Sequence, residues 1–168
     1  GHKVFLDMAA ELLEKNSNIK FVMIGTNLLR TNLELIEAMD RLEISEYSLL
    51  LGERSDIETA MNGMDVLVCP SLAESFGLVV IESLACGVPV VCSNLEALRL
   101  IVGGNYTVPI GDSHLFADKV NELISLAQKD RQVLGFNGRE NMRIKFNDTS
   151  MVEKYKSIYD EVTATHTK

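Results

Sequence analysis

One stretch decides how this chain is interpreted: Pro70-Ser71-Leu72-Ala73-Glu74-Ser75-Phe76-Gly77-Leu78-Val79-Val80-Ile81-Glu82. It follows a short apolar run, Met64 to Cys69, which is typical of a strand buried on both faces and ends at Pro70, a residue without a backbone N–H. We expect residues 71–75 to form a loop and a helix to begin between Ser75 and Gly77, with Ser75 as its N-cap. In a parallel sheet such a loop lies at the carboxyl end of a strand, where ligands bind.

The start of this helix is suited to an anion, because its first N–H groups are unpaired and its dipole is positive there. Gly77 would let a phosphate approach the backbone closely. Glu74 could accept hydrogen bonds from sugar hydroxyls, and Glu82, one turn beyond Leu78, from a ribose diol. Either glutamate alone is more often a solvated residue, but the strand, the turn and the following Ala85-Cys86-Gly87-Val88-Pro89-Val90-Val91 together favour a nucleotide-sugar site.

The pattern Pro-Ser-x-x-Glu-x-Phe-Gly-x-x-x-x-Glu, followed by Ala-x-Gly-x-Pro-Val-Val, resembles the signature of the family 4 retaining glycosyltransferases. Members of that family have two facing Rossmann-like domains, the GT-B architecture. The resemblance extends over nearly the whole chain. It implies that residues 1–168 are the C-terminal nucleotide-sugar-binding domain, an α/β fold with a parallel sheet, helices on both faces and a helical C-terminal segment, without the N-terminal acceptor domain.

The resemblance also implies roles for single residues. Glu74 would be the catalytic position, in contact with the transferred sugar, and Glu82 would bind the ribose. The amides of Gly77, Leu78 and Val79 would hold the diphosphate, Arg54 would lie against the base, and the other donor-binding positions would be Gly25, Gly52, Ser75 and Phe76. For Phe76 we prefer a packing role beneath the loop. The resemblance implies no metal and no cofactor, since the nucleotide-diphosphate sugar is a substrate.

The implied activity is transfer of a hexose or similar sugar, with retention, from a nucleotide-diphosphate donor to a saccharide or lipid-linked acceptor. The acceptor would bind through the absent N-terminal domain, so we expect the isolated chain to be inactive. Two alternatives stay open: a GT-B-like nucleotide-sugar epimerase, and a non-catalytic nucleotide-binding module of flavodoxin-like form.

Two departures from the family pattern matter. The family often has Gly-Gly and then a glutamate after Pro-Val-Val, where this chain has Ser93-Asn94-Leu95-Glu96. In the family a strand ending Gly-Arg-Leu is followed by a short loop with Lys-Gly, and Gly1 aligns with the glycine of that Lys-Gly, so the Arg and Lys that grip the phosphates in the family would precede residue 1. Independently, residues 4–14 carry a helical apolar stripe, and a crossover helix needs a strand before it. We therefore expect a fragment of a longer protein. Without its first strand the sheet would have a gap in its middle, so we expect the structure to show either a strand from elsewhere in that position or a rearranged sheet.

The rest of the chain alternates between strands and helices. Periodicity predicts strands over 20–24, 48–51, 64–69, 88–92 and 106–108, and helices over 4–14, 32–42, 57–61, 95–102, 114–128, 130–145 and 148–163. Gly135 and Gly138 are expected to interrupt the penultimate helix.

Composition narrows the function. A chain of 168 residues with 46% hydrophobic content fits one domain, and its lack of a long apolar run or signal peptide favours a cytoplasmic protein, with membrane contact only through the missing half. A net charge of −8 argues against binding of nucleic acid.

Arg139, Arg143 and Lys145 are interpreted as a solvated helix face. Cys69, Cys86 and Cys92 are expected to be free core thiols, and none of the scattered histidines is a convincing base.

Overall fold

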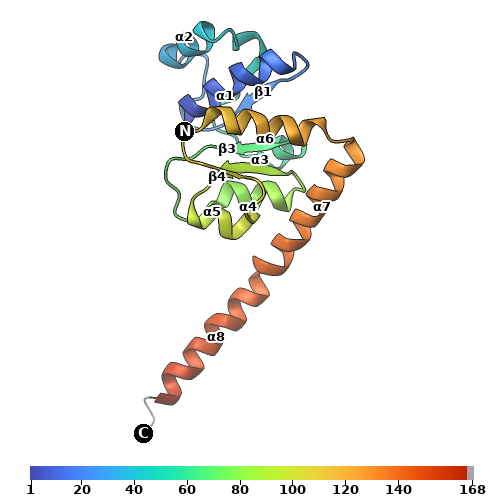
Figure 1. Ribbon diagram of the computed structural model, residues 1–168. Coiled ribbons are helices and arrows are strands. Elements are labelled where there is room, and N and C mark those ends of the chain that lie inside the picture. Colours follow the sequence, from blue (N-terminus) through green and yellow to red (C-terminus); the bar gives the residue numbers. More distant parts are fainter. Residues whose placement is uncertain (166–168) are drawn as a thin grey trace.

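The computed structural model describes residues 1–165 as an α/β body from which a long C-terminal helix projects (Figure 1). The helices are α1 (His2–Lys15), α2 (Leu33–Arg41), α3 (Ile57–Asn62), α4 (Leu78–Ala85), α5 (Glu96–Val102), α6 (Ser113–Ser125), α7 (Gln128–Lys145) and α8 (Asp148–Thr165), with a short 3₁₀ turn η1 (Ser45–Tyr47) that the sequence did not predict. The strands are β1 (Phe21–Met23), β2 (Ser48–Leu50), β3 (Leu67–Cys69), β4 (Val90–Ser93) and β5 (Thr107–Val108).

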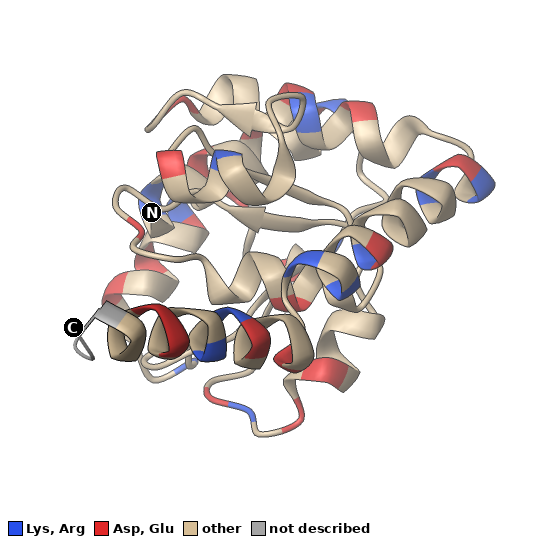
Figure 2. Cartoon of the chain, turned by 90° about the horizontal axis from the view of Figure 1, so that it is seen from below, with Lys and Arg blue, Asp and Glu red and all other residues tan. Residues whose placement is uncertain are grey.

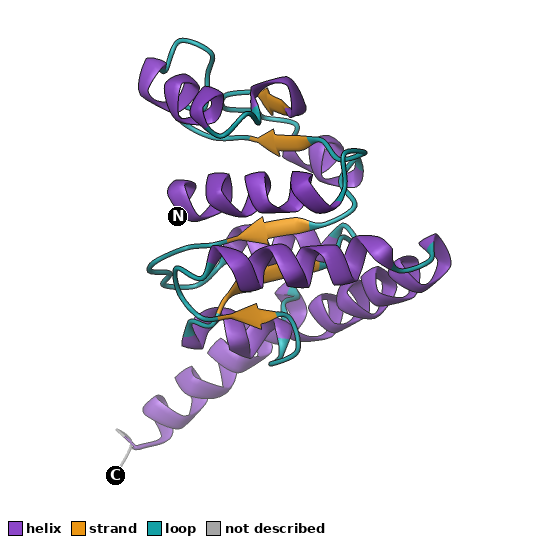
Figure 3. Cartoon of the chain, turned by 45° about the horizontal axis from the view of Figure 1, so that its top comes forward, coloured by secondary structure: helices purple, strands orange, loops and turns teal. Residues whose placement is uncertain are grey.

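The strands form two separate parallel sheets. β1 pairs with β2, and β3, β4 and β5 form a sheet in that order. The strands of both sheets run toward the same side of the molecule (Figure 3). Among the described residues no strand joins β1 to β3. The parallel α/β prediction is confirmed, and the sheet is divided by a gap between β1 and β3, with no strand of the described residues in that position.

A hollow of about 810 Å³ occupies this gap. Residues 21–24 of β1 line one side and residues 66–69 of β3 the other, and α1 contributes Phe5, Met8 and Leu12. α1 leads directly into β1, and within residues 1–165 no strand lies between β1 and β3.

Helices cover both faces of the three-stranded sheet. Successive side chains of a strand point to opposite faces, and in β4 Val91 packs with α1 and α6 whereas Val90 and Cys92 pack with α4 and α5. Phe116 of α6 and Leu98 of α5 are fully buried on these two faces. The predicted three-layer arrangement is therefore confirmed.

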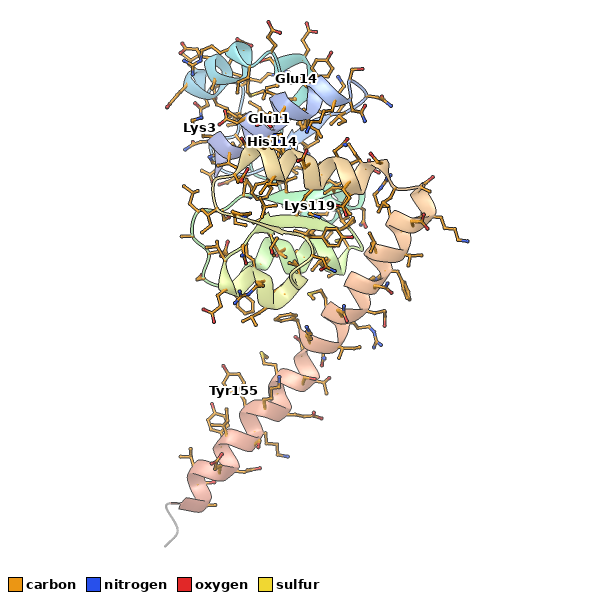
Figure 4. All side chains as sticks on the ribbon, in the orientation of Figure 1. Lys3, Glu11, Glu14, His114, Lys119 and Tyr155 are labelled. Atoms are coloured by element: carbon orange, nitrogen blue, oxygen red, sulfur yellow. The ribbon has the colours of Figure 1, made fainter. Side chains whose placement is uncertain are left out.

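Polar contacts accompany the apolar packing of α1 on α6 (Figure 4). Glu11 accepts a hydrogen bond from Ser113 Oγ at 2.9 Å and lies 2.8 Å from His114 Nδ1, while Lys15 Nζ lies 2.7 Å from Asp118 Oδ1. These groups are largely exposed, so each contributes little to stability. The apolar packing of α1 against α6 in the core therefore holds the two helices together.

The C-terminal helices differ from one expectation. Gly135 and Gly138 do not interrupt α7, which is continuous from Gln128 to Lys145. They lie instead where α7 packs against α4: a β-carbon on Gly135 would stand 1.8 Å from the carbonyl oxygen of Gly87. Their small size allows the two backbones to approach. Beyond this contact, α8 extends away from the body (Figure 1).

Candidate functional site

The loop after β3 ends at the tip of α4, and Gly77 is the N-cap of that helix. The prediction of Ser75 as N-cap was wrong. Gly77 takes the left-handed conformation, φ +89°, and no side chain caps the helix. Glu74 instead stabilises the turn, because its Oε1 accepts hydrogen bonds from the N–H groups of Ser75 at 3.0 Å and Phe76 at 3.4 Å. A carboxylate therefore stands at the positive end of the helix dipole.

Gly77 is required for packing as well as for its backbone conformation. A β-carbon there would lie 2.5 Å from Leu98 Cδ2 and 3.2 Å from Ile101 Cδ1, both on α5. From the sequence, glycine at this position was explained by the close approach of an anion. The structure shows a second reason why glycine is needed there, namely crowding by Leu98 and Ile101. The side of Gly77 where a β-carbon would project is occupied by the core.

The rest of the helix tip is open. The first hydrogen bonds of α4 are donated by Val80 and Ile81 to Gly77 O, at 3.0 and 3.2 Å, so the N–H groups of Leu78 and Val79 lie outside the helix ladder. The Leu78 side chain is 62% exposed and that of Val79 37% exposed. Leu78 and Val79 at this end of α4 are therefore exposed to solvent, whereas Gly77 is buried.

Phe76 does not pack beneath the loop as we expected. Its side chain is 50% exposed, and its ring meets Phe146 edge-on with the centroids 6.0 Å apart. Phe146 joins α7 to α8. The ring therefore links the loop to the C-terminal helices instead of anchoring it in the core.

Glu82 lies one turn into α4 and is exposed. It borders a hollow of about 450 Å³ between α3, α4 and α7, together with Glu58, Met61, Cys86 and Arg139. Glu74 is not among the residues that line this hollow. The two carboxylates thus have different surroundings, one at the helix tip and one on the helix flank.

Arg139 was assigned no role from the sequence, yet it is the basic residue of the hollow that contains Glu82. Residues so far apart in the chain share no spacing that a motif could reveal. Only the packing of α7 on α4 brings them together. Arg143, by contrast, forms a surface ion pair with Glu140 at 3.0 Å, as a solvated helix face predicts.

The loops after β1 and β2 are joined by backbone hydrogen bonds. Gly25 N–H donates to Gly52 O, and Gly52 N–H donates to Leu28 O, both at 2.9 Å. Gly52 has φ +64°, and a β-carbon on it would lie 2.6 Å from Leu29 Cδ2. Two predicted donor-binding glycines are thereby held side by side at the carboxyl end of the first sheet.

Arg54 projects from the same loop and pairs with Asp56, with Nη2 and Oδ2 2.5 Å apart. The hydrogen bond and the negative charge of Asp56 raise the pKa of Arg54, and the hydrogen bond from Arg54 lowers the pKa of Asp56. Both groups reach solvent, so the pair orients the guanidinium without adding much stability. A role for Arg54 against a base stays a prediction.

All three cysteines are free thiols, and Cys69 and Cys92 are buried as predicted, but Cys86 is only partly buried. Burial raises the pKa of Cys92 to about 12, with a smaller effect from neighbouring Cys69. The pKa of Cys86 is raised by partial burial first and by the charge of Glu58 next, while Arg139 lowers it and Glu82 raises it slightly. The pKa of Cys86 therefore depends on the charged residues around the hollow that contains Glu82.

Alkylation by iodoacetamide at pH 8 should modify Cys86 first, since Cys69 and Cys92 are buried. We expect Glu82→Gln to speed this reaction about twofold by lowering the pKa of Cys86, and Arg139→Gln to slow it by about as much. Mass spectrometry of the modified peptides measures both rates. Glu14→Gln, on distant α1, is the matched control; equal rates in all four proteins would mean that the hollow is not arranged as described.

Charges of both signs alternate along the helices seen in Figure 2. Within residues 1–165, no three His, Cys, Asp or Glu side chains gather closely enough to hold a metal ion. None of the helices in this part of the chain is both long and apolar enough to cross a bilayer.

Comparison with known proteins agrees with this geometry. Residues 1–126 match the family model described as glycosyl transferases group 1. The chain belongs to the group 1 glycosyltransferase family. It is 32% identical over 154 residues to the capsular polysaccharide biosynthesis glycosyltransferase CapM of Staphylococcus aureus, a match that covers 89% of this chain and 40% of CapM. The chain therefore spans less than half the length of this curated relative.

Two solved structures resemble the chain. The C-terminal domain of the group 1 glycosyltransferase LpcC of Francisella tularensis is 26% identical, with a TM-score of 0.76, and the match covers 88% of this chain and 80% of that domain. Anabaena HepE, solved in complex with UDP-glucose, is 21% identical with a TM-score of 0.84; the match covers 96% of this chain and 45% of HepE. The group 1 glycosyltransferase chain thus has the fold of a GT-B C-terminal domain.

Proposed function

We propose that this domain binds a nucleotide-diphosphate sugar and presents it for transfer, with retention, by the enzyme of which it forms part. The observation that carries the proposal is the open tip of α4, where Gly77, Leu78 and Val79 stand beside the Glu74 carboxylate at the carboxyl end of β3. A helix N-terminus in this position suits a diphosphate. The UDP-glucose complex of HepE, which has the same fold, supports this choice.

In the proposed arrangement the diphosphate lies on the amides of Gly77, Leu78 and Val79. Glu74 accepts hydrogen bonds from the sugar and is the catalytic residue, and Glu82 accepts them from the ribose. Gly25, Gly52 and Arg54 border the base, and Ser75 and Phe76 complete the loop around the donor. Helix dipole and amides stabilise the charge that develops on the leaving phosphate, a stabilisation that grows in the transition state and needs no metal.

The acceptor, a saccharide or lipid-linked molecule, would bind outside this domain. We therefore expect donor binding but no transfer by the isolated chain. We place the enzyme in the cytoplasm, with membrane contact only through other parts of the protein.

Removing the Glu82 carboxylate tests the proposal. Glu82→Ala should weaken binding of UDP-glucose by about 1.5–3 kcal/mol, roughly ten- to 150-fold, because a charge-assisted hydrogen bond to the ribose is lost. Isothermal titration calorimetry measures the affinity, and a thermal-shift screen with UDP, ADP and GDP sugars selects the donor beforehand, since a ligand at about 100 times its Kd adds roughly 2.7 kcal/mol.

Glu14→Ala, an exposed glutamate on α1, is the control and should leave the affinity unchanged. Unchanged donor affinity in Glu82→Ala would remove Glu82 from the site. Conversion of the donor to an epimer without an acceptor would indicate the epimerase instead, and binding of UDP with no preference for its sugar conjugates would indicate a non-catalytic module.

A further inference from the structure

The loop from Leu72 to Phe76 carries the Glu74 carboxylate but has little support of its own. None of its side chains is buried. Among residues 1–165 no hydrogen bond joins this loop to another part of the chain; its own hydrogen bonds run from the N–H groups of Ser75 and Phe76 to Glu74 Oε1. The position of the carboxylate therefore depends on what holds the backbone of residues 75 and 76.

The ring of Phe76 provides this support, because it contacts a residue far along the chain. It meets the ring of Phe146 at an interplanar angle of 86°, with the centroids 6.0 Å apart. Edge-to-face packing is a favourable arrangement of two aromatic rings. The N–H of Phe76 lies 3.4 Å from Glu74 Oε1, so a displacement of this ring would also displace a donor that holds the carboxylate.

Phe146 is tied to the core of the domain. Its N–H donates to Met142 O at 2.8 Å. Met142 is 2% exposed and packs with residues of α4 and α5. The ring that meets Phe76 therefore stands one turn beyond a buried anchor of α7.

Asn147 fixes the joint between α7 and α8, directly after Phe146. Its side-chain N–H₂ donates to the carbonyl oxygens of Arg143 at 3.1 Å and Ile144 at 3.0 Å. Its side-chain oxygen accepts a hydrogen bond from Ser150 N–H at 2.8 Å, in the first turn of α8. One side chain thus pairs otherwise unsatisfied backbone groups at the end of α7 and at the start of α8, which holds Phe146 in place.

We propose that Phe146 is a positioning residue for the sugar end of the donor: through Phe76 it holds the loop that aims Glu74. This inference rests on the proposed role of Glu74 at the sugar. The diphosphate has different support, because Gly77 at the tip of α4 is packed against Leu98 of α5. Loss of the Phe146 ring should therefore affect binding of a nucleotide sugar and spare binding of the nucleotide alone.

Calorimetry with UDP and UDP-glucose tests this distinction. Phe146→Ala should weaken binding of UDP-glucose about three- to tenfold, because the loop loses its aromatic contact, and should leave binding of UDP unchanged. Phe146→Tyr keeps a ring in place and should restore the affinity for UDP-glucose. Phe136→Ala removes a 63% exposed ring elsewhere on α7 and is the matched control, expected to change neither affinity.

A double-mutant cycle identifies the route by which Phe146 acts. Glu74→Ala should by itself weaken binding of UDP-glucose. Phe146→Ala should then add little further loss, because the ring acts through the carboxylate that is already absent. Independent, additive losses would overturn the inference, as would equal weakening of UDP and UDP-glucose binding by Phe146→Ala.

Limited proteolysis measures the contact without a donor. Endoproteinase Glu-C cleaves after glutamate, and Phe146→Ala should speed the cut after Glu74 at least roughly threefold. The cut after Glu53, in the loop after β2, is the internal reference and should not change. An unchanged rate after Glu74 would overturn the inference. If the unmutated chain bound neither UDP nor UDP-glucose, the proposed function would fail, whereas a faster cut in Phe146→Ala would still establish that this ring holds the loop.

Discussion

Replacing Gly135 with alanine is expected to lower the free energy of unfolding by about 3 kcal/mol. The new β-carbon would stand 1.8 Å from Gly87 O, a backbone atom that no rotamer change can move. Overpacking typically costs about 1–3 kcal/mol and occasionally more; a clash this close with a backbone atom should cost about 4 kcal/mol, of which the helix propensity of alanine offsets about 1 kcal/mol. Urea denaturation measures the loss, and Tm should fall by about 6–12 °C.

Gly138→Ala is the matched control on the same helix. Its β-carbon would meet Leu84 Cδ2 at 2.9 Å, the end of a flexible side chain that can turn aside. The gain in helix propensity then offsets the crowding, and we expect a change within about 1 kcal/mol. Equal losses for the two variants would contradict the close backbone contact between α7 and Gly87, in the turn after α4.

The site of the damage can also be measured. Met142, on α7, is 2% exposed in the core formed with α4 and α5. If Gly135→Ala forces α7 away from α4, hydrogen exchange should accelerate along α7 and leave α1 and α6 unchanged. Uniform acceleration would mean that the packing of α7 holds the whole domain together.

Gly77→Ala is the second substitution with a large expected effect, a loss of about 2–4 kcal/mol. A non-glycine residue at φ +89° costs about 1–2 kcal/mol, and the β-carbon would stand 2.5 Å from buried Leu98. Either the loop or α5 must shift, so the tip of α4 would move. Chemical denaturation measures the stability of this variant.

Gly111→Ala separates the two contributions. Gly111 has φ +84°, and a β-carbon there would have nothing within 4 Å. We expect this control to lose only the conformational part, about 1–2 kcal/mol. If the two variants lost the same amount, crowding against α5 would play no part and Gly77 would be needed for its backbone alone.

The sequence predicted the elements well where hydrophobic periodicity was strong. The strand before Pro70 ends at Cys69 as predicted but begins at Leu67 instead of Met64, whereas the helix near residues 95–102 and the long C-terminal helices formed within three residues of their expected bounds. Local chemistry was less reliable. Serine is a residue type favoured at N-caps, but here Glu74 accepts the hydrogen bonds of the loop N–H groups and Gly77, not Ser75, is the N-cap of the helix.

Phe76 was misjudged, and the position of Arg139 beside Glu82 was not foreseen, for a related reason. An aromatic ring beside a turn usually packs beneath it, but here the ring of Phe76 contacts Phe146 at the end of α7. Arg139 is exposed, as a solvated helix face predicts, but helix periodicity describes only its own helix and does not reveal the hollow that Arg139 shares with Glu82. In both cases the neighbour that decides the outcome comes from α7 or its end, and single-sequence patterns do not contain contacts of that range.

By itself the sequence determined the alternation of strands and helices, the family and the order of the loop, glycine and helix at residues 70–82, because these follow from local pattern and residue type. The tertiary structure alone decided that α7 brings Arg139 beside Glu82, that Gly77 and Gly135 are fixed by crowding, and that the sheet divides at β1 and β3. These features depend on which elements, distant in the sequence, pack against each other. Sequence pattern does not specify this, because it follows from how side chains fit together in a closely packed interior.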